Sequence, residues 1–224
     1  MRNNLSVFFN SVLGGIMIGI GGTVYLSCEN KVVGSLLFAI GLMTICVYQM
    51  ALFTGKIGYI VSSKPIYLLE CAVVWLGNLV GTTLVAFGVA LAKPSLFGTI
   101  HTVASGKLNQ NWYTALILGI LCGLLMFIAV DNFRNEKSHV ASKYIGIFAC
   151  VSTFILAGFE HSIADMYYFM LATFLPISTT DSFGFDMGML LNGFAFILIV
   201  TLGNVLGSFI IPLGKKYAVA AAEK

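Results

Sequence analysis

The stretch GFEHSIADMYYF, residues 158–169, places a glutamate, a histidine and an aspartate after sixteen apolar or small residues, YIGIFACVSTFILAGF from Tyr144 to Phe159. As a helix rising 1.5 Å per residue, those sixteen residues reach only ~24 Å, whereas the hydrocarbon core of a bilayer is ~30 Å thick. The segment therefore cannot cross a membrane without its charged stretch. Non-helical backbone at membrane depth occurs only where it is buried in protein or faces a water-filled cavity, so we expect a broken helix that borders a pathway.

The composition of the whole chain indicates a membrane protein. Of its 224 residues, 58% are hydrophobic and 9% are charged, and the mean hydropathy is +0.95, values that exclude an ordinary soluble domain. Apolar runs long enough to span a bilayer lie at about 7–28, 32–53, 66–92, 112–130, 144–175 and 187–214. We predict an all-α integral membrane protein in which residues 1–224 form one channel domain with six transmembrane helices.

The distribution of basic residues predicts the orientation. The first apolar run is too long and too glycine-rich for a cleavable signal peptide, so we expect it to stay in the membrane. Six spans place both termini on one side, and that side collects most Lys and Arg: Arg2, Lys64, Arg134, Lys137, Lys143, Lys215, Lys216 and Lys224, against Lys31, Lys93 and Lys107 on the other. We expect cytoplasmic termini in the plasma membrane and, because the net charge of +3 lies mostly in these loops, no nucleic-acid partner.

Two matching hexapeptides indicate an internal duplication. GNLVGT at 77–82 in the third span matches GNVLGS at 203–208 in the sixth. A repeat of three spans must be inverted in the membrane relative to its copy, so we predict inverted repeats at about 5–95 and 108–214. The second span then corresponds to the fifth, and MALFTGKIGYI at 50–60 is the matching break. The two breaks are 18 residues closer together along the chain than the two matching hexapeptides are. We place the extra 18 residues of the second half in TFLPISTTDSFGFDMG, residues 173–188.

The unbroken spans carry pairs of small residues that let helices approach closely. We expect these four spans to form a scaffold and the two broken spans to line the route. The pairs are Gly15/Gly19, Gly77/Gly81, Gly119/Gly123 and Gly203/Gly207.

Several of these motifs together resemble the formate/nitrite transporter family. They are LFTG at 52–55, GNLVG at 77–81, Lys143 with GFEHSIAD at 158–165, and TLGNVLG at 201–207. The resemblance covers about residues 7–212, and within the family the sequence is most similar to the hydrosulfide channels of clostridia. It implies an aquaporin-like protomer, a homopentamer with one pore per protomer, and small monovalent anions such as HS⁻, formate or nitrite as cargo.

The resemblance also implies which residues line the pore. Leu52 and Thr54 would lie where span two breaks, with Leu52 meeting Phe154 at a hydrophobic constriction and His161 in the chamber beyond it. Asn204 would correspond to a polar position near the pore or its vestibule, and so would Lys107, which precedes the fourth span.

The sequence departs from the family pattern at two positions. Gly123 stands where formate-conducting members have an asparagine beside the central histidine, and Ser6 stands where they carry a lysine before the first span. The first departure predicts a different central chamber. The second leaves Lys107 without a symmetric partner lysine.

A buried histidine suits the passage of an anion across an apolar barrier. The N-termini of half-helices present N–H groups and partial positive charge, Thr54 adds a hydroxyl, and His161 either polarises the anion or hands it a proton. Protonated HS⁻ is neutral H₂S, which passes hydrophobic gates more easily. The alternative for His161 is a packing role in which it satisfies a neighbouring backbone group.

Four further residues are interpreted as support for the broken helices. Glu160 is expected to cap the second half-helix or to accept backbone N–H groups, and Asp165 lies near that cap. Gly55 belongs to the break in span two, and Lys143, ~27 Å along a helix from His161, is placed at the cytoplasmic end, where it snorkels or pairs with an acid.

Two other expectations concern loop and surface residues. Lys56, which follows the break in span two, is placed to satisfy carbonyl groups or Glu70. His101 and His139 are expected to be exposed polar residues in loops.

The leading hypothesis is a passive, pH-sensitive channel for a small monovalent anion, most of all HS⁻. A proton-coupled symporter that uses the same residues and a neutral-solute pore are the alternatives, although the chain has neither NPA-like boxes nor twin pore histidines. It has no serine elbow, HExxH motif or metal-ligand spacing, so we predict neither an enzyme nor a resident cofactor or metal.

Overall fold

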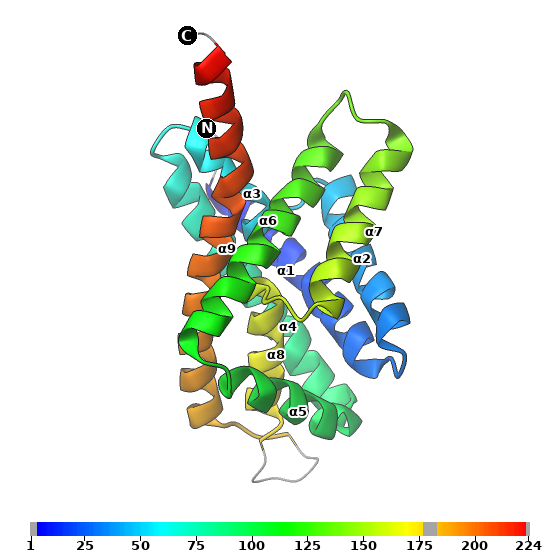
Figure 1. The fold of residues 1–224 in the computed structure, drawn as a ribbon. Coiled ribbons are helices and arrows are strands. Elements are labelled where there is room, and N and C mark those ends of the chain that lie inside the picture. Colours follow the sequence, from blue (N-terminus) through cyan, green and yellow to red (C-terminus); the bar gives the residue numbers. More distant parts are fainter. Residues whose placement is uncertain (1–3, 177–182, 223–224) are drawn as a thin grey trace.

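Four long helices form the scaffold of the protein. A computed structural model describes residues 4–176 and 183–222, and within those ranges it contains helices and no strand. The helices α1 (Asn4–Ser27), α4 (Tyr67–Ala92), α6 (Trp112–Arg134) and α9 (Met187–Ala222) are each long and apolar enough to cross a membrane. Both termini lie at one end of the bundle, called here the termini end (Figure 1). Arg2 and Lys224, and part of the connection expected to hold the insertion, fall outside the described residues.

The second and fifth spans are broken, as predicted. α2 (Lys31–Val47) and α7 (Val140–Leu156) have 17 residues each and so reach only ~25 Å. After its break, the second span continues as α3 (Phe53–Lys56) and the 3₁₀ turn η1 (Ile57–Ser62), and the fifth continues as α8 (Ser162–Phe174). Each break contains a residue with positive φ, Gln49 at 54° and Gly158 at 68°, a conformation that lets the chain turn and that glycine adopts without steric cost.

The position of the first break differs by a few residues from the sequence-based expectation. Thr54, Gly55 and Lys56 do not interrupt the helix; they form most of α3, and the non-helical segment precedes them at residues 48–52. The extended backbone of Leu52, with φ −119° and ψ 128°, directs the chain into this new turn of helix.

A helix that the sequence analysis did not predict lies across the end opposite the termini (Figure 1). It is α5 (Phe97–Leu108), preceded by the 3₁₀ turn η2 (Pro94–Leu96), and it packs against α8. The expectation that His101 is an exposed loop residue is therefore wrong. Ile100 and Ala104 on the same helix are buried, and His101 is turned inward so that its Nε2 lies 2.5 Å from the carbonyl oxygen of Leu175, just after the end of α8.

The long helices pack in two pairs, α1 with α4 and α6 with α9. Their contacts depend on the predicted glycines. A Cβ atom on Gly123 of α6 would lie 2.6 Å from the Cα of Asn204 on α9, and one on Gly15 of α1 would lie 2.9 Å from the Cα of Asn78 on α4. Real Cβ atoms do not approach backbone this closely, so the prediction of close helix contact through small residues is confirmed.

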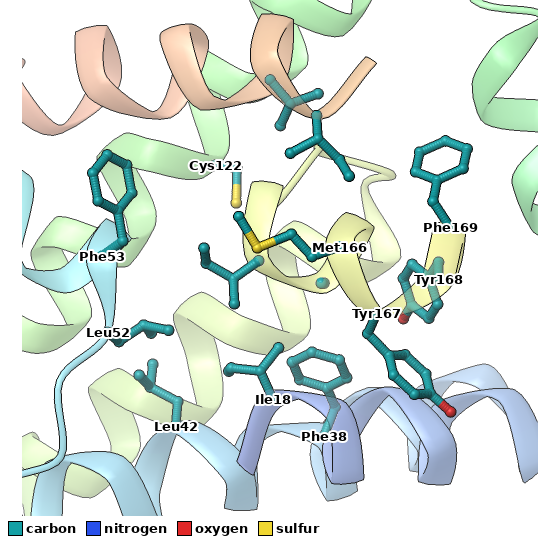
Figure 2. Packing of buried hydrophobic residues seen from close by; sticks show 14 of the residues in the cluster. Ile18, Phe38, Leu42, Leu52, Phe53, Cys122, Met166, Tyr167, Tyr168 and Phe169 are labelled. Carbon is teal, nitrogen blue, oxygen red and sulfur yellow. The ribbon is translucent and has the colours of Figure 1, made fainter. Parts of the chain in front are cut away.

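The broken helices enter the space between these pairs. Figure 2 shows part of the buried apolar cluster that results, with Ile18 on α1, Phe38 and Leu42 on α2, Leu52 before α3, and Met166 on α8. All five residues are at most 2% exposed, and Leu42 and Met166 are completely buried. The half-helices therefore form part of the core and are held on all sides by the scaffold.

Replacing Gly123 by alanine should weaken the protein markedly, because the added methyl group overlaps the backbone of α9 and forces the two helices apart. We expect a loss of about 2 kcal/mol or more in the free energy of unfolding, seen as a lower melting temperature in detergent. Gly88→Ala is the matched control, since a Cβ at Gly88 of α4 meets nothing within 4 Å. Equal melting temperatures for the two variants would contradict the close contact between α6 and α9.

Candidate functional site

An asparagine holds the first break in place. Asn78 on α4 is fully buried, and its Oδ1 accepts a hydrogen bond of 2.9 Å from the backbone N–H of Phe53, the first residue of α3. Its Nδ2 donates to the carbonyl oxygens of Ser11 on α1 at 2.7 Å and Ala51 in the break at 2.9 Å. One side chain thus joins the scaffold, the break and the start of the half-helix.

A second asparagine does the same at the other break. Asn204 on α9 is also fully buried, and its Oδ1 accepts from the N–H of Ser162, the first residue of α8, at 2.9 Å. Its Nδ2 donates to the carbonyl oxygens of Gly119 on α6 at 2.8 Å and Glu160 in the break at 2.9 Å. These are the hydrogen bonds of Asn78 repeated in the second half of the chain.

These contacts give Asn204 a task different from the one expected. Its amide group is engaged by three backbone partners, so it holds the break and has no donor left for cargo. The same contacts use the N–H groups of Phe53 and Ser162, so the two half-helices offer an anion fewer free donors than their N-termini alone suggest. The matching GN motifs predict a repeat, but they do not by themselves identify Asn78 as a functional residue.

His161 and Thr54 meet between the two half-helices. The Nε2 of His161 lies 2.9 Å from the Oγ1 of Thr54, across 107 residues of sequence, and both residues are buried. The Nδ1 of His161 accepts the backbone N–H of Ala164 at 3.3 Å and so caps α8. The structure therefore joins the two residues that the sequence analysis placed on separate breaks.

The cap determines the protonation pattern of the imidazole ring. Because Nδ1 accepts a hydrogen bond, the proton of the neutral ring is on Nε2, which donates to the Thr54 hydroxyl. An imidazolium would place a second proton on Nδ1 opposite the N–H of Ala164, so the cap opposes it. Nδ1 therefore has the packing role considered for His161, because it caps α8. Nε2, which contacts Thr54, is the atom available for a polar role in a pathway.

A cavity at the termini end borders the first break, and residues on both sides of Thr54 line it. Its volume is about 310 Å³, and the buried Leu52 contributes to its wall. Phe154, the other expected gate residue, lies against the imidazole, with ring centroids 5.5 Å apart at 39°, and meets Phe38 edge-on. A constriction formed by Leu52 and Phe154 together stays a prediction.

Two carboxylates hold Lys107, which lies in the last turn of α5. At the end of α5, its Nζ pairs with Glu160 and lies 2.9 Å from the Oδ1 of Asp165, a charge contact without the angles of a hydrogen bond. Gln110 donates to the second oxygen of Glu160 at 2.7 Å. Burial by itself lowers the pKa of Lys107, but Asp165 and Glu160 outweigh it and hold that pKa above its ordinary value.

This cluster changes the interpretation of three residues. The carboxylate of Glu160 does not cap α8, because Lys107 and Gln110 occupy it, and the cap is His161 instead. Lys107 is only 15% exposed and neutralised, so its charge is not free to attract an anion. Asp165, 1% exposed, belongs to the same cluster, and no spacing in the sequence indicated that α5 would bring these groups together.

The remaining support residues lie apart from the site. Lys143 is in the first turn of α7 near the termini end, as expected, and within the described residues it forms no ion pair with an acid. Gly55 brings α3 onto α6, where a Cβ would meet Val130 at 2.8 Å. The expected pairing of Lys56 with Glu70 is confirmed at 2.5 Å.

Comparison with known proteins gives a consistent result along the chain. The model of the formate/nitrite transporter family matches residues 1–217. The chain is 29% identical to the nitrite transporter NirC of Escherichia coli over 247 aligned residues, covering 100% of this chain and 87% of the relative. It is also 29% identical to the formate channel FocA of Haemophilus influenzae over 205 residues, covering 81% of this chain and 71% of the relative.

Solved structures share the fold. A pentameric formate channel with formate bound superposes with a TM-score of 0.81 at 23% identity, over 98% of each chain. An ion channel of the same family superposes with a TM-score of 0.80 at 28% identity, over 97% of this chain and 91% of the other.

Proposed function

Because the chain belongs to the formate/nitrite transporter family, we propose that it is a passive, pH-sensitive channel for small monovalent anions, with hydrosulfide as its main cargo and formate and nitrite as further candidates. Its relatives are transporters and channels, so the chain is a membrane transport protein and not an enzyme. The observation that carries the proposal is the buried contact between His161 and Thr54 where the two broken helices meet.

The contact supplies what an anion lacks in an apolar barrier. A monovalent anion that leaves water must be given hydrogen bonds or lose its charge. When it displaces the Thr54–His161 hydrogen bond, it meets the Nε2–H of the ring and a hydroxyl that can rotate to donate. The neutral ring shares its Nε2–H with HS⁻ as a hydrogen bond and does not release it, because an imidazolate is far too basic. Full transfer, which yields neutral H₂S that crosses the apolar residues around Phe154 and Leu52, requires the ring first to take a second proton from the water on the entry side. That proton then leaves with H₂S, is released when H₂S ionises on the far side, and the ring is left neutral.

The surroundings fit a pentamer in a bilayer. Large apolar side chains are exposed on the outer faces of several helices, among them Val32, Leu36 and Ile40 on α2 and Leu76, Leu84 and Leu91 on α4. Lipid tails or neighbouring copies would cover them. A homopentamer with one pore per protomer agrees with the pentameric formate channel of the same fold. The basic loops support cytoplasmic termini in the cytoplasmic membrane.

Flux into liposomes tests the proposal. Purified protein is reconstituted, and the uptake of HS⁻, formate, nitrite, chloride and lactate is measured over a pH series, with protein-free liposomes to subtract permeation of the neutral acids. We expect HS⁻ to enter fastest, with a rate that rises as the pH falls. If none of these anions passes, the proposal is wrong.

Two outcomes would favour the alternatives. Accumulation of the anion against its own gradient when only a pH gradient is imposed would indicate a proton-coupled symporter. Passage of neutral solutes such as glycerol without any anion flux would indicate a neutral-solute pore.

A further inference from the structure

Among the described residues, Lys56 and Arg134 line the cavity and Lys107 lies beside the second break, and the two lysines are neutralised. Lys56 pairs with Glu70 at 2.5 Å, and Lys107 pairs with Glu160 and Asp165. Neither charge can act strongly on a passing ion, because a nearby carboxylate cancels most of its field.

Arg134 is the third basic residue, and its surroundings differ. It is the last residue of α6, its side chain is exposed, and it lines the 310 Å³ cavity at the termini end together with Leu52 and Lys56. Within the described part of the chain, Arg134 has no carboxylate at ion-pair distance. Its guanidinium lies over the ring of Tyr59, 5.0 Å from the centroid.

Two acids lie close to Arg134 in the sequence. Glu136 forms no ion pair with it within the described residues, and Asp131 is occupied elsewhere. Asp131, one helical turn before Arg134, accepts a hydrogen bond of 3.1 Å from the hydroxyl of Tyr59 and lies 3.4 Å from the Nζ of Lys215. Tyr59 therefore has two functions at once: its hydroxyl engages Asp131, and its face supports Arg134. Stacking on an aromatic ring holds a guanidinium in place without cancelling its charge.

We propose that Arg134 is a specificity-determining residue that concentrates monovalent anions, and repels cations, in the cavity leading to Leu52. The inference rests on the proposed function as an anion pathway, and it assigns the attraction to a residue that no motif indicated. A positive charge at the wall of a cleft with low-dielectric sides raises the local anion concentration. Arg134 does this before the anion loses its water, and His161 acts after that point.

Charge variants measured at two salt concentrations test this role. At ~10 mM salt, where charges act over ~30 Å, Arg134→Gln should lower anion flux roughly threefold and Arg134→Glu further, whereas Arg134→Lys should retain most of it. At ~1 M salt, where the range is ~3 Å, the variants should be equal. Lys137→Gln is the matched control, because Lys137 is an exposed basic residue of the following loop that does not line the cavity.

A second measurement does not require transport. Cys46 lines the same cavity, so the ratio of its modification rates by a negatively and a positively charged thiol reagent of equal size reports the local potential, with Cys46→Ser as the blank. Arg134→Gln should lower this ratio by up to tenfold at low salt. If the wild-type protein conducts no anion but Arg134→Gln still lowers the ratio of the Cys46 modification rates, the proposed function is wrong and the inference about Arg134 holds. An unchanged ratio, or a loss of flux that persists at 1 M salt, overturns the inference.

Discussion

Lys107→Met should destabilise the protein by about 3–5 kcal/mol, because it leaves the carboxylates of Glu160 and Asp165 buried without a counter-charge. These side chains are 3% and 1% exposed, so water cannot replace the lysine. This loss of stability affects the break before α8, because the backbone carbonyl of Glu160 is held there by Asn204 and Asp165 lies in the first turn of α8. Thermal unfolding in detergent measures the effect, and we expect anion flux to fall with the loss of folded protein.

A charge-neutral variant separates stability from attraction of the anion. The triple substitution Lys107→Met, Glu160→Gln and Asp165→Asn removes all three charges and should recover most of the lost stability. Lys143→Met is the control, because that lysine is far from the break and forms no ion pair with an acid within the described residues. If Lys107→Met melts at the wild-type temperature, Lys107 does not compensate buried charge. If the triple variant is stable but conducts no anion, the positive charge of Lys107 serves transport directly.

The sequence predicts the scaffold well because its signals are local. Runs of apolar residues locate the spans to within a few positions, and a run too short for the bilayer locates a break. α5 is not predicted, because FGTIHTVASGKL has only a short apolar face, and nothing local in the sequence shows that α8 covers that face. The same cause explains His101, whose partner is a carbonyl 74 residues away.

The candidate site could be predicted only in part, for a related reason. His161 and Thr54 stand out as polar residues in apolar runs, and each is recognisable alone. Their contact depends on how the two halves of the chain pack against each other, and the spacing of residues along the sequence does not show this packing. Asn78 and Asn204 sit in matching motifs, but their role lies in hydrogen bonds to the backbone of distant segments. Its place before α8 predicts that Glu160 caps the helix, but its carboxylate pairs with the buried Lys107 instead.

His161→Asn should lower anion flux about 100-fold at neutral pH, the lower end of what positioned proton transfer contributes, and should abolish its pH dependence. Asparagine is a good N-cap, so its Oδ1 can still accept the N–H of Ala164, although its shorter amide does not reach the position from which Nε2 contacts Thr54. What it cannot do is give up a proton and take it back at these pH values. The variant thus keeps the packing role of the histidine and removes its chemistry.

The measurement is flux of HS⁻ and formate across a pH series, after subtraction of protein-free liposomes. Melting temperature should stay near the wild-type value, which shows that any loss of flux is not a loss of fold. Thr54→Ser is the matched control, since it retains the hydroxyl 2.9 Å from Nε2 and should keep both the rate and the pH profile. A pH profile of His161→Asn that matches the wild type would mean that the cargo crosses as the anion, stabilised by hydrogen bonds alone. In that case the cap on Nδ1 would be the main contribution of His161.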